Sequence, residues 1–262
     1  MKTCFITGAT SGIGRACAER FAKEEYNLIL NGRRGELLNE LKAQLETQCG
    51  VAVTTLNFDV RDRAAVETAL TTTLGFHDAQ HFNHKEEGID VLINNAGLAL
   101  GLEKEHEGSL DDYETMIDTN IKGLLYITKA IVPDMVRRGK GHIINIGSVA
   151  GEAAYPNGSV YCATKAAVKA LSDGLRIDLV DTPIRVTNIK PGLVETNFSV
   201  TRFHGDKARA DKVYQGIRPL RGEDIADVVY YAASAPEHVQ IAEVLVLAMH
   251  QANGSIIYRA SK

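Results

Sequence analysis

Apolar runs of strand length alternate with segments of helical spacing along most of this chain. Apolar runs that predict buried strands lie at residues 4–7, 26–31, 51–60, 89–93, 141–147 and 243–247. Apolar residues three or four positions apart, which predict helices, lie at residues 13–21, 36–48, 63–74, 112–125 and 223–235. Because this alternation continues without a break in composition, it predicts one α/β domain over residues 1–262. We expect a doubly wound parallel sheet with helices on both faces.

The composition refines this picture by excluding other classes of protein. Of the 262 residues, 45% are hydrophobic and 24% are charged, which supports a large core and excludes a disordered chain. The formal net charge of −4 gives no electrostatic reason to expect nucleic acid or an anionic membrane as a partner. No apolar run approaches the roughly 20 residues that span a bilayer, and the first glycine loop comes too early for a signal peptide. The four cysteines form no CxxC pair, so we expect reduced thiols in a cytoplasmic protein.

A glycine-rich turn follows the first predicted strand and opens the first predicted helix. The turn consists of Gly8, Ala9, Thr10, Ser11, Gly12, Ile13 and Gly14. Backbone N–H groups and the helix dipole favour an anion at such a position, and glycines let a pyrophosphate approach the backbone. The spacing G-x-x-x-G-x-G differs from the commoner G-x-G-x-x-G, yet the flanking strand and helix predict a dinucleotide site of Rossmann type. An ordinary tight turn is the alternative.

The residues that follow the second and third predicted strands indicate which dinucleotide binds. In a Rossmann unit, an acid about 20 residues after the glycines binds the ribose of NAD, whereas arginine accommodates the 2′-phosphate of NADP. Here Gly32 is followed by Arg33 and Arg34, and guanidinium groups suit a phosphate, so the sequence favours NADP. A solvated surface pair is the alternative. After the third strand come Asp59 and Val60, and the Asp59 carboxylate is a candidate acceptor for the adenine amine.

Tyr161 and Lys165 are four residues apart, a spacing that places both on one face of a helix. A free tyrosine, with a pKa of about 10, is a poor base, but a neighbouring ammonium lowers that pKa and favours proton transfer. Ser148 ends a predicted strand upstream, at the edge where ligands bind in open α/β sheets. Asn120 stands in an otherwise apolar helical stretch and is either a packing residue or a site residue. A half-exposed surface pair is the alternative for the tyrosine and the lysine.

Together these motifs resemble those of the short-chain dehydrogenase/reductase family over residues 3–246. The resemblance is carried by Thr7 to Gly14, Asn94-Asn95-Ala96-Gly97, Asn120, Ser148, Tyr161, Lys165, Pro191-Gly192 and Thr196. It implies the strand order 3-2-1-4-5-6-7 in a seven-stranded sheet. It also implies a homo-oligomer, with a tetramer favoured.

The resemblance further implies a role for each of these residues. Tyr161 would exchange the proton with the substrate hydroxyl, Ser148 would hold the substrate oxygen, and Lys165 would lower the tyrosine pKa. Tyr161 and Lys165 would also contact the cofactor, with Lys165 at the nicotinamide ribose, and Asn120 would hold a water that links Lys165 to solvent. The remaining cofactor contacts would come from Asn95, Gly97, Pro191, Gly192, Val194 and Thr196.

Within the family, residues 97–101, 118–120 and 191–199 resemble those of the NADP-dependent 3-hydroxy acid dehydrogenases, also called serine or L-allo-threonine dehydrogenases. That resemblance implies an NADP-dependent oxidoreductase that acts on CH–OH groups of short acids such as serine, L-allo-threonine or 3-hydroxyisobutyrate. One alternative is an NADPH-dependent reductase of larger or neutral carbonyl compounds, such as a sugar, a fatty-acyl ketone or a diketone. A second alternative is a non-catalytic NADP-binding sensor, which the presence of all four catalytic residues disfavours.

A carboxylate substrate needs a cationic partner, and a bidentate guanidinium suits it. Arg202 is the candidate nearest to the Pro-Gly motif, in a segment, residues 195–222, that we expect to cover the substrate. Arg209, Arg218 and Arg221 are further candidates in the same segment. A helix-surface or subunit salt bridge is the alternative role for Arg202.

Two segments lie outside these motifs. The tail, residues 250–262, carries apolar residues at 256–258, which could dock on another subunit or pack on their own domain. Residues 75–88 contain His77, His81 and His84, whose spacing could place three imidazoles on one helical face. Because nothing supplies an acid partner for these histidines, we expect a solvated loop and no metal.

Overall fold

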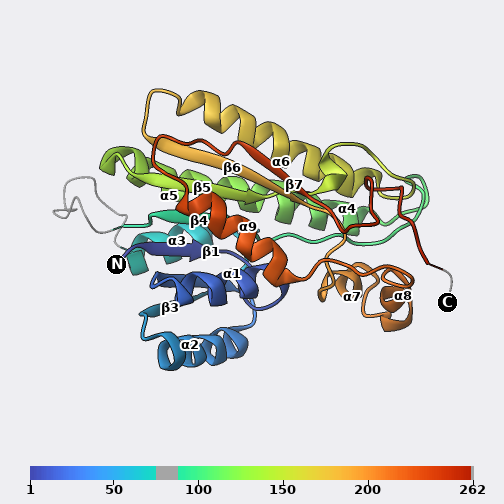
Figure 1. The fold of residues 1–262 in the computed structure, drawn as a ribbon, viewed down its shortest axis with the longest axis horizontal. Helices are drawn as coiled ribbons and strands as arrows, with labels where there is room; N and C mark the ends of the chain where they lie inside the picture. Colours follow the sequence, from blue (N-terminus) through green and yellow to red (C-terminus); the bar gives the residue numbers. More distant parts are fainter. Residues whose placement is uncertain (75–87, 261–262) are drawn as a thin grey trace.

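The computed structural model describes residues 1–74 and 88–260. Within these residues, seven strands form a single sheet in which every strand runs parallel to its neighbours (Figure 1). The strands are β1 (Thr3–Ile6), β2 (Asn27–Gly32), β3 (Val53–Asn57), β4 (Val91–Asn94), β5 (Gly141–Ile146), β6 (Ile184–Pro191) and β7 (Glu243–Val246). The order across the sheet, β3-β2-β1-β4-β5-β6-β7, confirms the expected fold class and strand order.

Helices cover both faces of this sheet (Figure 1). On one face lie α1 (Gly12–Lys23), α2 (Gly35–Cys49) and α9 (Gly222–Ser234). On the other lie α3 (Arg63–Leu74), α5 (Leu124–Arg138) and α6 (Ser159–Asp178). The shorter elements are α4 (Leu110–Ile117), a π-helix (Asp118–Gly123) that leads into α5, a 3-10 turn (Val149–Gly151), α7 (Phe198–Arg202) and α8 (Lys207–Lys212).

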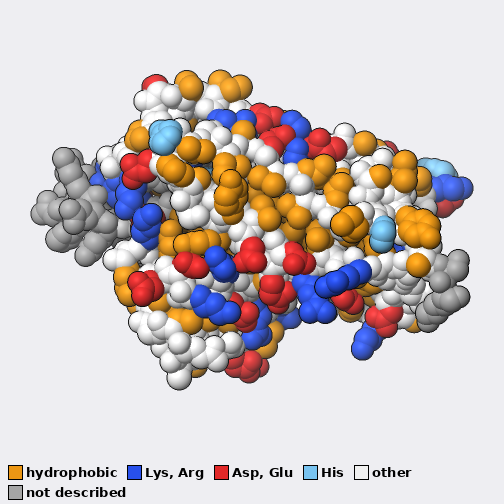
Figure 2. Space-filling view, viewed as in Figure 1, with side chains coloured by type: hydrophobic (Ala, Val, Ile, Leu, Met, Phe, Trp, Pro, Cys, Tyr) orange, Lys and Arg blue, Asp and Glu red, His pale blue; other side chains and the backbone are white. Residues whose placement is uncertain are grey.

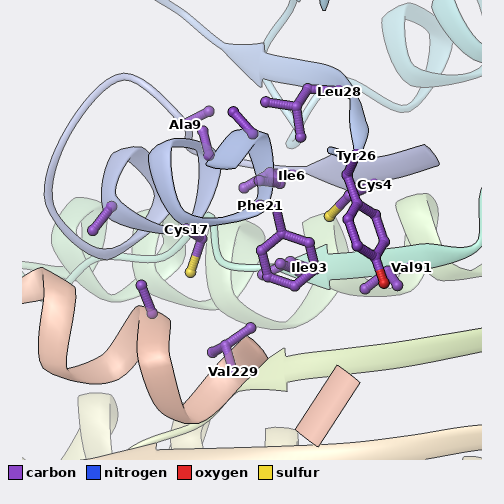
Figure 3. Close-up of a cluster of buried hydrophobic side chains, with 14 of the residues drawn as sticks. Cys4, Ile6, Ala9, Cys17, Phe21, Tyr26, Leu28, Val91, Ile93 and Val229 are labelled. Atoms are coloured by element: carbon purple, nitrogen blue, oxygen red, sulfur yellow. The ribbon is translucent and has the colours of Figure 1, made fainter. Parts of the chain in front are cut away.

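Alternate residues of the central strand β1 enter two different cores. Cys4 and Ile6 pack in the cluster that includes α1 and α9, whereas Phe5 packs in the cluster that includes α3 and α5. A sheet that is buried on both faces needs strands that are apolar at nearly every position, as the sequence pattern showed. Figure 3 shows part of the first cluster, where the Phe21 and Tyr26 rings meet edge-on with centroids 5.0 Å apart.

The parallel arrangement brings the carboxyl ends of all the strands to one edge of the sheet, so the loops that follow them meet there. The predicted strand over residues 51–60 is shorter in the structure, and Asp59 and Val60 belong to the loop beyond the end of β3. Among the described residues, no helix combines the length and the apolar character that crossing a membrane requires.

Candidate active site

A cavity of about 990 Å³ lies at the carboxyl edge of the sheet and collects residues from the loops after β1 to β6. The predicted site residues that line it are Gly8, Thr10, Ser11, Gly12, Ile13, Arg33, Arg34, Asp59, Val60, Asn95, Gly97, Ser148, Tyr161, Lys165, Pro191, Gly192, Val194, Thr196 and Arg202. Gly14 and Asn120 are not part of the lining; they support it from behind. One cavity therefore contains the glycine turn, the arginine pair and the candidate catalytic groups.

Backbone conformation and close packing explain why glycine occupies three positions of the first turn. Gly8 has a φ of 67° and Gly12 a φ of 56°, in the left-handed region that favours glycine. Gly14 packs so closely on the Gly8 carbonyl and the Asn95 amide that it leaves no room for a Cβ atom. The Asn95 amide donates to the Gly8 carbonyl at 3.2 Å, and the Thr7 hydroxyl accepts from the Asn95 backbone N–H at 3.0 Å. These contacts hold the loops after β1 and β4 together, with the open backbone of the turn facing the cavity.

Arg34 lies beside this turn. Its Nη2 atom donates to the Thr10 hydroxyl at 2.7 Å and to the Ser11 hydroxyl at 3.1 Å. Within the described part of the chain, no carboxylate lies within ion-pair distance of Arg34. An arginine without an acidic partner beside two hydroxyls and a helix N-terminus suits a phosphate group.

Asp59 is engaged more fully than the sequence suggested. Its carboxylate accepts hydrogen bonds from the Arg61 guanidinium at 2.7 to 3.1 Å and from the Arg61 backbone N–H at 3.0 Å, and lies 3.7 Å from the more exposed Arg33. Burial acts to raise the pKa of Asp59, but the Arg61 hydrogen bonds and the two positive charges outweigh burial and lower that pKa. Sequence reasoning missed Arg61, which nothing marked out from other surface arginines. Hydrogen bonding of Asp59 to an adenine amine stays a prediction.

Ser148, Tyr161 and Lys165 converge at the other end of the cavity. Ser148 follows β5, and its hydroxyl accepts from the Ala150 N–H at 3.1 Å and lies within hydrogen-bonding reach of Tyr161. Tyr161 and Lys165 share a face of α6, and both are buried. The Lys165 ammonium donates to the Ile146 carbonyl at 2.8 Å.

Burial dominates the ionisation of both α6 residues. It raises the pKa of Tyr161 well above its usual value, and the neighbouring Tyr155 adds to that effect. The hydrogen bond from Ser148 and the charge of Arg202 act in the opposite direction and lower the pKa of Tyr161. The effect of Lys165 on the pKa of Tyr161 stays a prediction, and the pKa of Lys165 itself is lowered by burial to about 8.

Asn120 lies in the π-helix between α4 and α5, where the sequence predicted an uninterrupted helix. Its side chain accepts from the Leu98 N–H at 2.9 Å and donates to the Leu98 carbonyl at 2.8 Å. A third hydrogen bond, at 3.0 Å, runs to the Thr164 hydroxyl, next to Lys165 on α6. Asn120 therefore ties the loop after β4 to the helix that carries the catalytic candidates. Its expected water contact stays a prediction.

Arg202 reaches the cavity from the end of α7. Its Nε atom donates to the Gly101 carbonyl and its Nη1 atom to the Tyr155 hydroxyl, both at 3.0 Å. The guanidinium carbon lies 5.5 Å from the centre of the Tyr155 ring and 5.7 Å from that of the Tyr161 ring. Tyr155 lines the cavity and was missed, because no motif or spacing in the sequence singled it out.

No carboxylate among the described residues lies within ion-pair distance of Arg202. The alternative role as a salt bridge within its own chain therefore finds no support in the described structure. The other candidates, Arg209, Arg218 and Arg221, do not line the cavity, and Arg209 pairs with Glu103 at 3.8 Å.

The segment over residues 195–222 supplies several cavity residues, among them Phe198, Phe203 and Tyr214. The tail packs on its own chain: Gln251 accepts from the Leu193 N–H at 2.8 Å, and Ile257 lines the cavity. Ile256 and Tyr258 remain exposed, so a further contact of the tail with another subunit stays a prediction.

No group of three potential metal ligands occurs among residues 1–74 and 88–260. His77, His81 and His84 lie outside the described residues.

A doubly wound sheet with a glycine turn, an arginine pair and a Ser-Tyr-Lys set in one cavity defines a dinucleotide-dependent oxidoreductase. The family model for short chain dehydrogenases matches residues 2–207, and the chain belongs to that family.

Individual relatives are similar over nearly the whole chain. The NADP-dependent 3-hydroxy acid dehydrogenase YdfG of Salmonella typhi is 48% identical over 247 residues, covering 94% of each chain. Sulfoacetaldehyde reductase 2 of Chromohalobacter salexigens is 43% identical over 248 residues, again covering 94% of each. Among solved structures, the closed form of a serine dehydrogenase complexed with NADP+ is 43% identical, with a TM-score of 0.87 and coverage of 99% of this chain and 100% of that one.

Proposed function

We propose that this protein is an NADP-dependent oxidoreductase that transfers a hydride between the cofactor and the 3-hydroxyl, or 3-oxo group, of short hydroxy acids. Serine, L-allo-threonine and 3-hydroxyisobutyrate are the expected substrates. The observation that carries the substrate class is Arg202, which lies in the cavity 5.7 Å from the Tyr161 ring without an acidic partner among the described residues. The relatives named above, which act on small acidic substrates by their names, support this choice.

The residues present fit NADP. The backbone of the glycine turn from Gly8 to Gly14 would hold the pyrophosphate, and Arg34 and Arg33 would bind the 2′-phosphate. Lys165 would hold the nicotinamide ribose, and residues 191–196 the carboxamide. When bound, NADP supplies the hydride acceptor for alcohol oxidation, or NADPH the donor for the reverse reaction.

The protein would supply orientation and proton transfer. Ser148 would hold the substrate oxygen beside Tyr161, and the Tyr161 phenolate would remove the hydroxyl proton during oxidation. The Arg202 guanidinium, already fixed by the Gly101 carbonyl and the Tyr155 hydroxyl, would bind the substrate carboxylate. Ser148 and Tyr161 would thus bind the 3-hydroxyl group at one end of the substrate, and Arg202 would bind the carboxylate at the other end.

Initial rates of oxidation of L-serine, L-allo-threonine and 3-hydroxyisobutyrate, each with NADP and with NAD, test this proposal. We expect turnover of the acids with NADP favoured at least about tenfold in kcat/KM, which corresponds to about 1.4 kcal/mol. In the same assay, Arg202→Met should raise KM for the acids and leave KM for neutral alcohols unchanged. Reduction of neutral ketones or diketones without acid turnover would instead favour the alternative substrate class. Equal effects of Arg202→Met on acids and neutral alcohols would remove Arg202 from the carboxylate site.

We also propose that the protein is a cytoplasmic homo-oligomer, with a tetramer favoured. The four cysteines are free thiols, consistent with a reducing compartment. Hydrophobic side chains gather on the face formed by α6, β7 and α9, where Tyr231 and Leu245 are exposed (Figure 2).

A further inference from the structure

A buried lysine lies directly behind the turn that carries Ser148. Lys190 is the penultimate residue of β6, directly before Pro191, and is only 6% exposed. Its ammonium lies 2.8 Å from a carboxylate oxygen of Glu243 and 3.0 Å from one of Glu152. A buried ammonium is costly unless it is paired, so this cation holds both carboxylates in place. Lys190 does not line the cavity.

Glu152 belongs to the same short turn as Ser148. The Gly151 N–H donates to the Ser148 carbonyl at 3.0 Å, and the Glu152 N–H donates to the Val149 carbonyl at 3.1 Å. A Cβ atom at Gly151 would lie 2.6 Å from the Lys165 carbonyl oxygen, so the turn packs tightly against α6 at that point. Glu152 is therefore joined by backbone hydrogen bonds to the turn that begins at Ser148 and packs against α6.

Glu243 anchors the other side of the lysine. Glu243 lies on β7, and Lys169, one turn beyond Lys165 on α6, lies 3.5 Å from its second carboxylate oxygen. Burial acts to raise the pKa of Glu243, but the hydrogen bond from Lys190 outweighs burial and lowers that pKa. Burial likewise acts to lower the pKa of Lys190, and its hydrogen bonds to Glu243 and Glu152 raise that pKa instead. Lys190 and Glu243 are thus both charged at neutral pH, and the ion pairs of the cluster link β6, β7, α6 and the turn.

Lys190 also connects the ion pairs with Glu152 and Glu243 to the cavity, through its position in the sequence. Lys190 directly precedes Pro191 and Gly192, whose loop lines the cavity, and the Ser148 hydroxyl lies 3.5 Å from the Pro191 carbonyl. The lysine therefore joins the strand end at Pro191 to the turn at Ser148 through one ion pair.

We propose that Lys190 is a positioning residue for the reaction, and that its ion pair with Glu152 fixes Ser148 relative to the loop at Pro191 and Gly192. The inference rests on the proposed function in one respect, that Ser148 holds the substrate oxygen.

Two variants test this role. Glu152→Gln keeps the size of the side chain and leaves Lys190 paired with Glu243, so it should fold; Lys190→Met removes the cation itself. The measurements are kcat, KM, the NADP dissociation constant by calorimetry and the thermal midpoint. Because a misplacement of about 1 Å can cost on the order of 100-fold in rate, we expect kcat to fall about tenfold or more in both variants. The NADP dissociation constant should stay within about twofold, and the double variant should be no slower than Lys190→Met.

Lys169→Met is the matched control, because Lys169 contacts the same Glu243 carboxylate but not Glu152. Its kcat should stay within about twofold of the wild type. Wild-type kcat in Glu152→Gln, or a lower thermal midpoint without any loss of kcat, would overturn the positioning role. The assay uses whichever substrate the wild type turns over, acid or neutral ketone. Failure of the wild type on hydroxy acids would therefore contradict the proposed substrate alone and leave the comparison of variants intact.

Discussion

At the scale of single residues, Arg202 connects substrate recognition with proton transfer. Its charge is one of two influences that lower the pKa of the buried Tyr161, and its free guanidinium edge is the proposed carboxylate site. A carboxylate paired with Arg202 would neutralise part of that charge at the moment of binding. The hydrogen bond from Ser148, which also lowers the pKa of Tyr161, would then gain weight relative to the charge of Arg202.

The buried Lys165 gives the stability of the protein a defined pH dependence. Its folded pKa of about 8 lies below the value of 10.5 for an exposed lysine. Between these pH values the unfolded state binds more protons than the folded state, so through this residue the free energy of unfolding rises with pH. Since methionine carries no charge, Lys165→Met should be more stable than the wild type at pH 7.5. The difference should shrink towards pH 10, by at most about 1.4 kcal/mol per pH unit, in urea unfolding experiments.

Lys129→Met is the control for this measurement, because Lys129 is exposed on α5. Its effect on the free energy of unfolding at pH 7.5 and at pH 10 gives the baseline for replacing an exposed lysine by methionine. A constant stability difference for Lys165→Met over the same range would show that Lys165 does not titrate there.

At the scale of elements, the start of α1 depends on a glycine that has no room for a side chain. Gly14→Ala would place a methyl group against the Gly8 carbonyl and the Asn95 amide. We expect a loss of about 1–3 kcal/mol in the free energy of unfolding, together with weaker NADP binding, because the glycine turn must shift. Urea unfolding and calorimetric titration with NADP measure the two effects.

Gly174, inside α6, has open space where a side chain would lie. A Cβ atom at Gly174 would find no described atom within 4 Å, so Gly174→Ala should stabilise the protein by about 0.5–1 kcal/mol. NADP binding should be unchanged in this variant. Similar losses in both variants would mean that the close contact at Gly14 is not the cause of the loss.

The elements were predictable where local pattern and tertiary environment agree. Strands such as β1 and β4 are apolar at nearly every position because both of their faces are covered, and the sequence shows that directly. The π-helix at Asp118–Gly123 was not predictable, since its apolar spacing fits an α-helix and the Asn120 hydrogen bonds to Leu98 within it join residues far apart in the sequence. The end of β3 was misplaced for a similar reason: Val60 is buried, but in a loop.

The site residues also divide into those that local sequence predicts and those that depend on long-range contacts. Glycine positions, the Tyr161–Lys165 spacing and Ser148 at a strand end follow from local rules, and the structure brings them into one cavity. Tyr155 and Lys190 act through contacts with residues far away in the sequence, Arg202 and Glu243, and no local pattern encodes such pairs. Long-range partners of this kind need the folded structure.

At the scale of the whole molecule, the edge strand β7 predicts assembly. Tyr231 on α9 is 67% exposed, Leu245 on β7 is 46% exposed, and the backbone edge of β7 has no neighbour among the described strands. We expect light scattering to give a multiple of the 28.5 kDa chain mass, with four chains favoured. Leu245→Lys combined with Tyr231→Lys should shift the mass towards the monomer, because the interface would bury two unpaired charges.

Leu110→Lys is the control, since Leu110 is an exposed apolar residue on α4. This variant should keep the wild-type mass. A monomeric mass for the wild-type protein at micromolar concentration would contradict the assembly.

The strand order also determines when each pair of neighbouring strands can form during synthesis. In β1, Cys4 pairs with Leu28 of β2 on one side and with Val91 of β4 on the other. On a ribosome the first pairing becomes available early, whereas the second must wait until β4 has been synthesised, so β1 stays an open edge in the meantime. Contacts so distant in sequence slow folding and lengthen the exposure of apolar strands to other chains. The pairing of β1 with β4, which places the glycine turn beside Asn95, thus requires that the unpaired edge of β1 avoids contact with other chains until β4 has been synthesised.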